Sequence, residues 1–162
     1  MEDYSVFVFA RVLHVLGVVL WIGGVAFVTT VLIAAIKQLK DTDDRYQLFE
    51  KLEGRFAFQA KITTLITGLT GFYMTWALDG WSRYLQPEFW WMHLMTVVWL
   101  IFTLVLFVFE PLFLHRWFEH HARQNSDRTF RIIHRMHIVL LTLSLITVAG
   151  AVAGSHGWLI SL

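Results

Sequence analysis

Two histidines inside long apolar stretches are the side chains of this chain best suited to chemistry. His14 lies in residues 12–36 and His93 lies in residues 89–109, and neither stretch contains Asp, Glu, Lys or Arg. Neutral imidazole is a strong iron ligand, and two histidines from different helices can hold a haem between them inside a helix bundle. We therefore predict a haem b group with His14 and His93 as the axial ligands of its iron.

Five neighbouring residues complete the predicted cofactor site: Arg11, Gly17, Trp21, Trp90 and Trp99. Arg11 precedes His14 by about one helical turn and is expected to meet a haem propionate, while Gly17 lets a flat macrocycle approach the backbone. Trp21 and Trp99 are expected to form walls of the site. Close helix packing is the other interpretation of Gly17, because small residues let two membrane helices approach each other.

Four further histidines are alternative metal ligands: His156, His137, His134 and His115. His134 and His137 are about one helical turn apart, so they could share a metal or belong with His115 to a second haem. His120 and His121 stand beside charged residues and are expected to be solvated. Interfacial histidines and arginines also bind lipid phosphates, which is a non-metal interpretation of the whole group.

Glu110 and Lys61 are the other ionisable residues expected within the membrane. A buried Glu–Lys pair would offset the desolvation cost of both groups. Glu110 could instead relay protons, and Lys61 could extend its ammonium group to the inner surface. Met92 and Met95 flank His93, and because thioethers favour copper(I) they leave copper as an alternative to haem; simple packing also explains them.

Four uncharged stretches predict the elements that must position these side chains. Residues 12–36, 62–78, 89–109 and 136–162 each approach or exceed the ~20 residues that cross a bilayer as a helix. The chain is 57% hydrophobic and only 15% charged. We predict an all-α fold: one integral membrane antiparallel four-helix bundle over residues 1–162, with helices at about residues 4–40, 46–78, 87–122 and 128–155. The first stretch is too long for a cleavable signal peptide.

Local signals mark the ends of these helices. Thr42 and Asp43 are candidate N-cap residues for the second helix. Asp79–Gly80 is a turn signal, and Pro87 suits the first turn of the third helix. Pro111 is expected to kink that helix because it removes a backbone hydrogen bond.

The distribution of charge predicts the orientation of the bundle. With helices alternating up and down, eleven of the thirteen Lys and Arg residues fall at one face and only Arg11 and Arg83 at the other. The positive-inside rule then makes the basic face cytoplasmic and places both termini outside, in the bacterial cytoplasmic (inner) membrane. Topology accounts for the basic residues, so no nucleic-acid partner is expected. The absence of cysteine excludes disulfides and thiolate chemistry.

The segment HVLGVVLWIGG, residues 14–24, resembles a superfamily of four-helix bacterial membrane proteins. Its members include the CopD-type copper-resistance domain and the HemJ-type protoporphyrinogen oxidase. The likeness extends to a Thr-Gly-Leu patch at Thr67–Leu69 and a Trp-rich entry to the third helix at residues 89–94. The HemJ-type resemblance implies haem b near His14. It also implies a lysine early in the third helix, where this chain has His93 as the nearest ionisable residue.

The sequence therefore predicts a membrane haem b protein that performs one-electron redox chemistry. Its expected partners are the lipid bilayer and a quinone, a tetrapyrrole or another protein, and it would be an oxidoreductase that is protoporphyrinogen-oxidase-like or quinone-linked. A homo-oligomer is compatible with the sequence. Two other functions remain open: a copper or metal transport protein of the CopD type, and a non-catalytic membrane scaffold.

Overall fold

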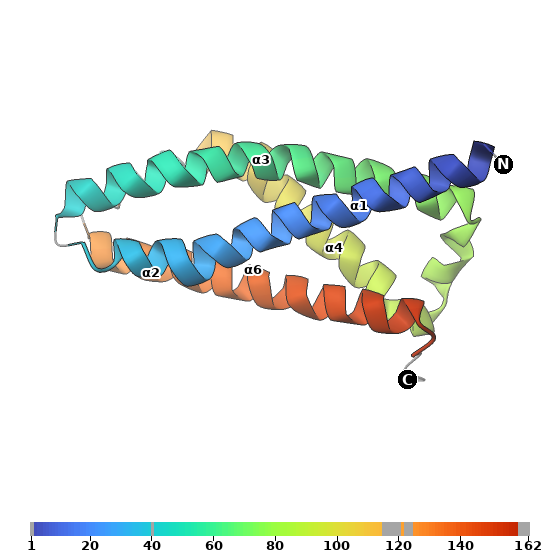
Figure 1. The fold of residues 1–162 in the computed structure, drawn as a ribbon. Coiled ribbons are helices and arrows are strands. Elements are labelled where there is room, and N and C mark those ends of the chain that lie inside the picture. Colours follow the sequence, from blue (N-terminus) through green and yellow to red (C-terminus); the bar gives the residue numbers. More distant parts are fainter. Residues whose placement is uncertain (1, 40, 115–120, 122–124, 159–162) are drawn as a thin grey trace.

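The computed structural model describes residues 2–39, 41–114, 121 and 125–158 (Figure 1). Within those residues the chain is helical and contains no strand, as the all-α prediction requires. The described residues form four long helical stretches, of which the second and third are linked by two short 3-10 helices.

The first stretch consists of α1 (Glu2–Phe27), the π-helical segment η1 (Val28–Leu32) and α2 (Ile33–Ile36). The hydroxyl groups of Thr29 and Thr30 donate to the carbonyls of Val25 and Ala26 at 2.6 and 2.8 Å. Such bonds compete with the helical backbone pattern, which is consistent with the local widening. The stretch ends at Ile36 and not near residue 40 as predicted.

The second stretch is α3 (Thr42–Ala77), and it begins before the predicted residue 46. Its N-cap is Asp41, not Thr42 or Asp43: Asp41 Oδ1 accepts the backbone N–H groups of Asp43 and Asp44 at 2.7 and 3.1 Å. The predicted turn after α3 is confirmed. Asp79 has a φ of 49°, and Gly80 is buried where an added Cβ would lie 3.3 Å from the carbonyl oxygen of Thr75.

The third stretch is assembled from several pieces. The 3-10 helices η2 (Gly80–Leu85) and η3 (Pro87–Phe89) precede α4 (Trp90–Leu104), so Pro87 opens a short 3-10 turn and the α-helix starts three residues later. The π-helical segment η4 (Val105–Leu114) follows and contains Pro111, where the sequence predicts a kink. The predicted end of this helix, with His115 and His120, lies outside the described residues.

The fourth stretch is α6 (Ser126–Ser155), whose N-cap Asn125 accepts the Arg128 N–H at 3.0 Å. In space the helices form two pairs: α1 lies along α3, and α4 packs on α6 (Figure 1). The start of α1 and the end of α6 lie at the same end of the molecule.

Two buried clusters hold the pairs together. In the first, the rings of Trp21 and Phe102 meet edge to face with centroids 4.8 Å apart, beside Ala57 and Ala60 of α3. The second cluster lies near the turn between α2 and α3, where Phe49 and Phe130 meet at 5.5 Å. Aromatic pairs in this geometry add to the free energy of burial.

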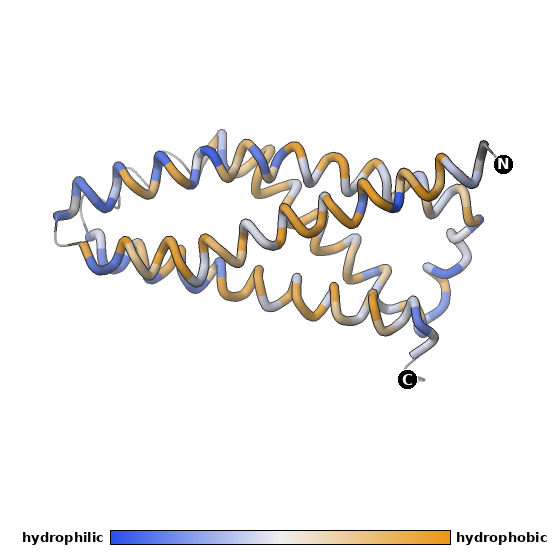
Figure 2. Tube along the Cα trace, viewed as in Figure 1, coloured by the Kyte–Doolittle hydropathy of each residue, from blue (hydrophilic) through white to orange (hydrophobic). Residues whose placement is uncertain are grey.

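Three helical segments of the described chain are long and apolar enough to cross a membrane: Tyr4–Ile36, Pro87–Leu112 and Ser126–Ser155. They also expose many apolar side chains, which suits contact with lipid. The first half of α3 is hydrophilic (Figure 2), and α3 does not meet the same criteria. The predicted fourth span through α3 therefore stays a prediction.

Candidate functional site

His14 is fixed on α3 through one nitrogen of its ring. His14 Nδ1 lies 3.0 Å from the carbonyl oxygen of Thr67 and 3.2 Å from Thr70 Oγ1. The ring rests over Gly71, where an added Cβ would lie 3.1 Å from His14 Cε1. Because a carbonyl only accepts hydrogen bonds, Nδ1 carries the proton and Nε2 keeps its lone pair. Histidines that bind metals usually donate their other N–H group in this way.

His93 has a different environment. Its Nε2 lies 2.8 Å from the carbonyl oxygen of Tyr84 in η2, and its side chain is exposed. The buried residues of α4 are Trp91, Val98 and Phe102, and helical geometry puts His93 roughly half a turn away from them. His14 and His93 are therefore bonded to different elements, α3 and η2, and no contact between the two described rings is present.

The residues predicted to surround the cofactor take part mainly in helix packing. Trp99 Nε1 donates to the carbonyl of Thr64 at 2.9 Å, and the Trp99 ring covers Gly68. The Trp90 ring likewise covers Gly150 of α6. A Cβ at Gly17 would lie 2.5 Å from Thr67 Oγ1, so α3 occupies the space beside this glycine.

The other two predicted residues, Arg11 and Trp21, have different surroundings. Arg11 is exposed. Trp21 is only 3% exposed, and its indole Nε1 has no hydrogen-bond partner among the described residues. Trp21 is therefore the one member of the predicted set with a buried donor left unpaired, within the part of the chain that the structure describes.

The three alternative ligands that the structure describes bond to backbone carbonyls or to neighbouring side chains, and no hydrogen bond joins two of these three histidines. His134 Nε2 lies 3.1 Å from the Thr29 carbonyl oxygen, and its Nδ1 lies 2.7 Å from Lys37 Nζ. His137 and His156 each bond through Nδ1 to the carbonyl four residues earlier, at 2.9 and 2.8 Å. No cluster of three or more His, Cys, Asp or Glu residues suited to a metal ion occurs in the described ranges.

Lys61 and Glu110 form an ion pair between α3 and η4. Lys61 Nζ lies 2.5 Å from Glu110 Oε2, and the two side chains are 30% and 28% exposed. Of the interpretations that the sequence leaves open for these two charges, the structure shows the pairing. Near it on α3, the hydroxyl groups of Thr64 and Thr67 are buried and have no hydrogen-bond partner among the described residues.

Sequence reasoning missed the part of Thr67 and Thr70 in holding His14. A signal was present, since hydroxyl residues recur at helical spacing along α3 at Thr63, Thr64, Thr67 and Thr70. The hydroxyl groups of Thr63 and Thr70 donate to carbonyls within α3. The hydroxyl group of Thr67 faces Gly17 of α1.

Comparison with known proteins adds no relative to these observations. No protein-family model matches the chain, and no curated protein or solved structure matches it either.

Proposed function

We propose that the chain is a multi-pass protein of the bacterial cytoplasmic membrane, with α3 as a fourth span and both termini outside. The three apolar helices support membrane insertion. The pairing of Lys61 with Glu110 supports the burial of α3, because unpaired charges are costly within a bilayer. The gathering of basic residues at one end supports the orientation.

We further propose that the protein binds haem b through His14 and transfers single electrons. The observation that carries this proposal is the hydrogen bond from His14 Nδ1 to the Thr67 carbonyl. This bond orients the imidazole and leaves Nε2 as a free donor to iron. Bound haem would supply one-electron redox chemistry, with a quinone, a tetrapyrrole or a partner protein exchanging the electron.

The chain's own residues would have separate tasks in this function. Thr67 and Thr70 hold the His14 ring. Buried Trp21, about two turns farther along the same face of α1, has an indole N–H that could donate to a bound group. Glu110, beside Lys61, would exchange protons near the inner end of the bundle. His93 as a second iron ligand stays a prediction: its Nε2 is bonded to the Tyr84 carbonyl, so Nδ1 would be the nitrogen left for the metal.

An absorption spectrum of the protein purified after growth with a haem precursor tests the proposal. We expect a Soret band in the wild type that is lost in His14→Ala. His156→Ala is the matched control, because this exposed histidine bonds only within its own region of α6, and it should leave the spectrum unchanged. His93→Ala separates one-histidine from two-histidine ligation. A colourless wild type, or a His14→Ala variant with the wild-type spectrum, contradicts the proposal.

The copper alternative gains less support from the described contacts. Met95 falls on the side of α4 that carries Trp91 and Val98, whereas His93 bonds to Tyr84 on another side. Bound copper without a Soret band would nevertheless favour the CopD-type function, and a metal-free, colourless protein would favour the scaffold.

A further inference from the structure

An open groove lies between α1 and α3, on the side of this pair that faces away from α4 and α6. It has a volume of about 460 Å³, and only α1 and α3 contribute to its lining. Its apolar wall includes Leu20, Gly23, Gly24, Phe27 and Phe56. Leu20 and Phe27 are more than half exposed, so the groove opens away from the other two long helices.

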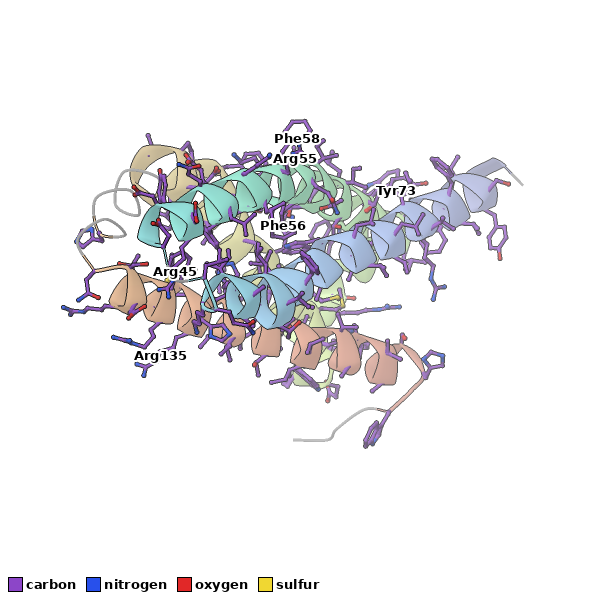
Figure 3. All side chains as sticks on the ribbon, turned by 60° about the vertical axis from the view of Figure 1, so that its left-hand side comes forward. Arg45, Arg55, Phe56, Phe58, Tyr73 and Arg135 are labelled. Carbon is purple, nitrogen blue, oxygen red and sulfur yellow. The ribbon has the colours of Figure 1, made fainter. Side chains whose placement is uncertain are left out.

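The two adjacent glycines have opposite roles in this groove. A Cβ at Gly24 would collide with the Phe56 ring, so Phe56 closes the groove beneath this position. A Cβ at Gly23 would meet nothing within 4 Å. In Figure 3, Phe56 points from α3 toward the other helices, whereas Phe58 points away from them. Gly23 therefore keeps the middle of the groove open.

Two polar side chains, Arg55 and Gln59, lie at the rim of the groove. Gln59 Nε2 donates to the Leu20 carbonyl at 3.4 Å. Arg55 is exposed and has no ion pair or hydrogen bond with any described residue. Lys51, Glu50 and Glu53 lie nearby in the sequence but do not line the groove. Arg55 is the one charged residue among the described residues of the lining, so this end of the groove carries a positive charge.

The direction of the helices fixes where that charge lies. Gly17 contacts Thr67 and Gly24 contacts Phe56, so α1 and α3 are antiparallel. Arg55 and Phe27 consequently lie at the end of the groove nearer the turn between α2 and α3. Leu20 lies farther along, toward the centre of the proposed bilayer. The groove is thus cationic at its cytoplasmic end and apolar beyond it.

We propose that this groove binds one anionic phospholipid of the cytoplasmic leaflet, with its headgroup phosphate at Arg55 and an acyl chain along Gly23 toward Leu20. Arginine pairs well with phosphate because its guanidinium group donates two parallel hydrogen bonds. The proposal rests on α1 and α3 lying in the membrane, and it is independent of haem.

Native mass spectrometry of the full chain in detergent tests the charge at this site. Phosphatidylglycerol and phosphatidylcholine with identical acyl chains are added at equal concentrations. We expect about a fivefold preference of the wild type for phosphatidylglycerol, because one cation attracts its net negative charge by about 1 kcal/mol, whereas choline neutralises the phosphate of phosphatidylcholine. Arg55→Gln should reduce the ratio to about one. Arg128→Gln, which removes an exposed cation of α6 outside the groove, should keep the wild-type ratio.

A second pair of variants tests the apolar part of the groove. Gly23→Leu places an apolar side chain in the groove from a position where an added Cβ meets nothing within 4 Å, and it should weaken binding of both lipids at least severalfold. Gly54→Leu is the matched control, because an added Cβ there also meets nothing within 4 Å but the residue lies outside the groove. Glycerol phosphate, which has no acyl chain, should not displace phosphatidylglycerol.

Four results overturn the proposal: an equal response to both lipids in the wild type, wild-type selectivity in Arg55→Gln, equal losses in Gly23→Leu and Gly54→Leu, or displacement by glycerol phosphate. Membrane insertion is tested separately with variants outside the groove, as described below. Failure of the lipid site and failure of the proposed topology are therefore distinguishable.

Discussion

The ion pair between Lys61 and Glu110 is the best-defined polar contact between two of the apolar segments. Its atoms lie 2.5 Å apart, and both side chains are less than one third exposed. Two charges removed from water are stabilised when they meet each other, whereas one charge left alone retains the full desolvation cost. The pair should therefore behave as a unit when it is mutated.

Lys61→Met and Glu110→Gln test this coupling. Each single variant should lower the free energy of unfolding by about 1–3 kcal/mol, less than for a fully buried pair because water screens both groups in part. The double variant should lose less than the sum of the two single losses. Thermal unfolding in detergent measures the cycle, and strictly additive losses would contradict it.

The sequence indicated that Lys61 and Glu110 could pair, but it left a lysine extending to the inner surface and a proton-relaying glutamate open as alternatives, and it did not indicate the partners of His14. Each of the two charges borders an uncharged stretch, so the sequence alone does not distinguish pairing from contact with water at the membrane surface. His14, by contrast, binds a backbone carbonyl of Thr67, and every residue has such a group. The segment around His93 is apolar on all sides, so its sequence does not show which side of α4 faces the other helices. The side on which His93 lies became clear only in the structure.

At the scale of the helices, glycines beneath tryptophan rings determine how closely neighbouring helices pack. Trp91 lies on Gly154, where an added Cβ would be 2.5 Å from the ring, and Trp99 lies on Gly68 at the same distance. A methyl group at either position must push a large ring out of place. Gly54 differs because nothing lies within 4 Å of its added Cβ.

Gly154→Ala and Gly68→Ala should each destabilise the protein by about 1–3 kcal/mol, which is typical of overpacking. Gly54→Ala should instead stabilise it, by up to about 1 kcal/mol, because alanine is the better helix former and the site has room. Thermal unfolding of the three variants measures the opposite signs. Equal shifts in all three would mean that the glycines do not define these contacts.

The positions of the long helices could be predicted from the sequence, and their ends could not. Long uncharged stretches predict helices because few other structures satisfy the polar N–H and C=O groups of the backbone within a bilayer. The ends depend on which of several neighbouring residues becomes the cap. Asp41, Thr42 and Asp43 are all good N-cap residues by type, and the structure shows that Asp41 takes this role.

For the whole molecule, the arrangement of charge is the strongest constraint on orientation. Arg45 bonds to Asp127 at 2.7 Å and to the Leu39 carbonyl at 2.6 Å, and it joins the α2–α3 turn to the start of α6 (Figure 3). Most of the basic residues gather at this same end. Exposed Trp76, Trp81 and Trp158 belong to the opposite end, where an interfacial aromatic belt is expected.

The proposed topology can be tested with single cysteines, because the natural chain contains none. Ser82→Cys places a thiol in exposed η2, and Gln47→Cys places one on the exposed start of α3. In spheroplasts, which lack the outer membrane but keep the cytoplasmic membrane intact, a membrane-impermeant maleimide should label Ser82→Cys at once. It should label Gln47→Cys only after lysis, because the basic end of the bundle faces the cytoplasm. Labelling of both thiols before lysis would show that α3 does not span the bilayer. Labelling of Gln47→Cys alone before lysis would show that the basic end faces outward, and the proposed lipid site would then not lie in the cytoplasmic leaflet.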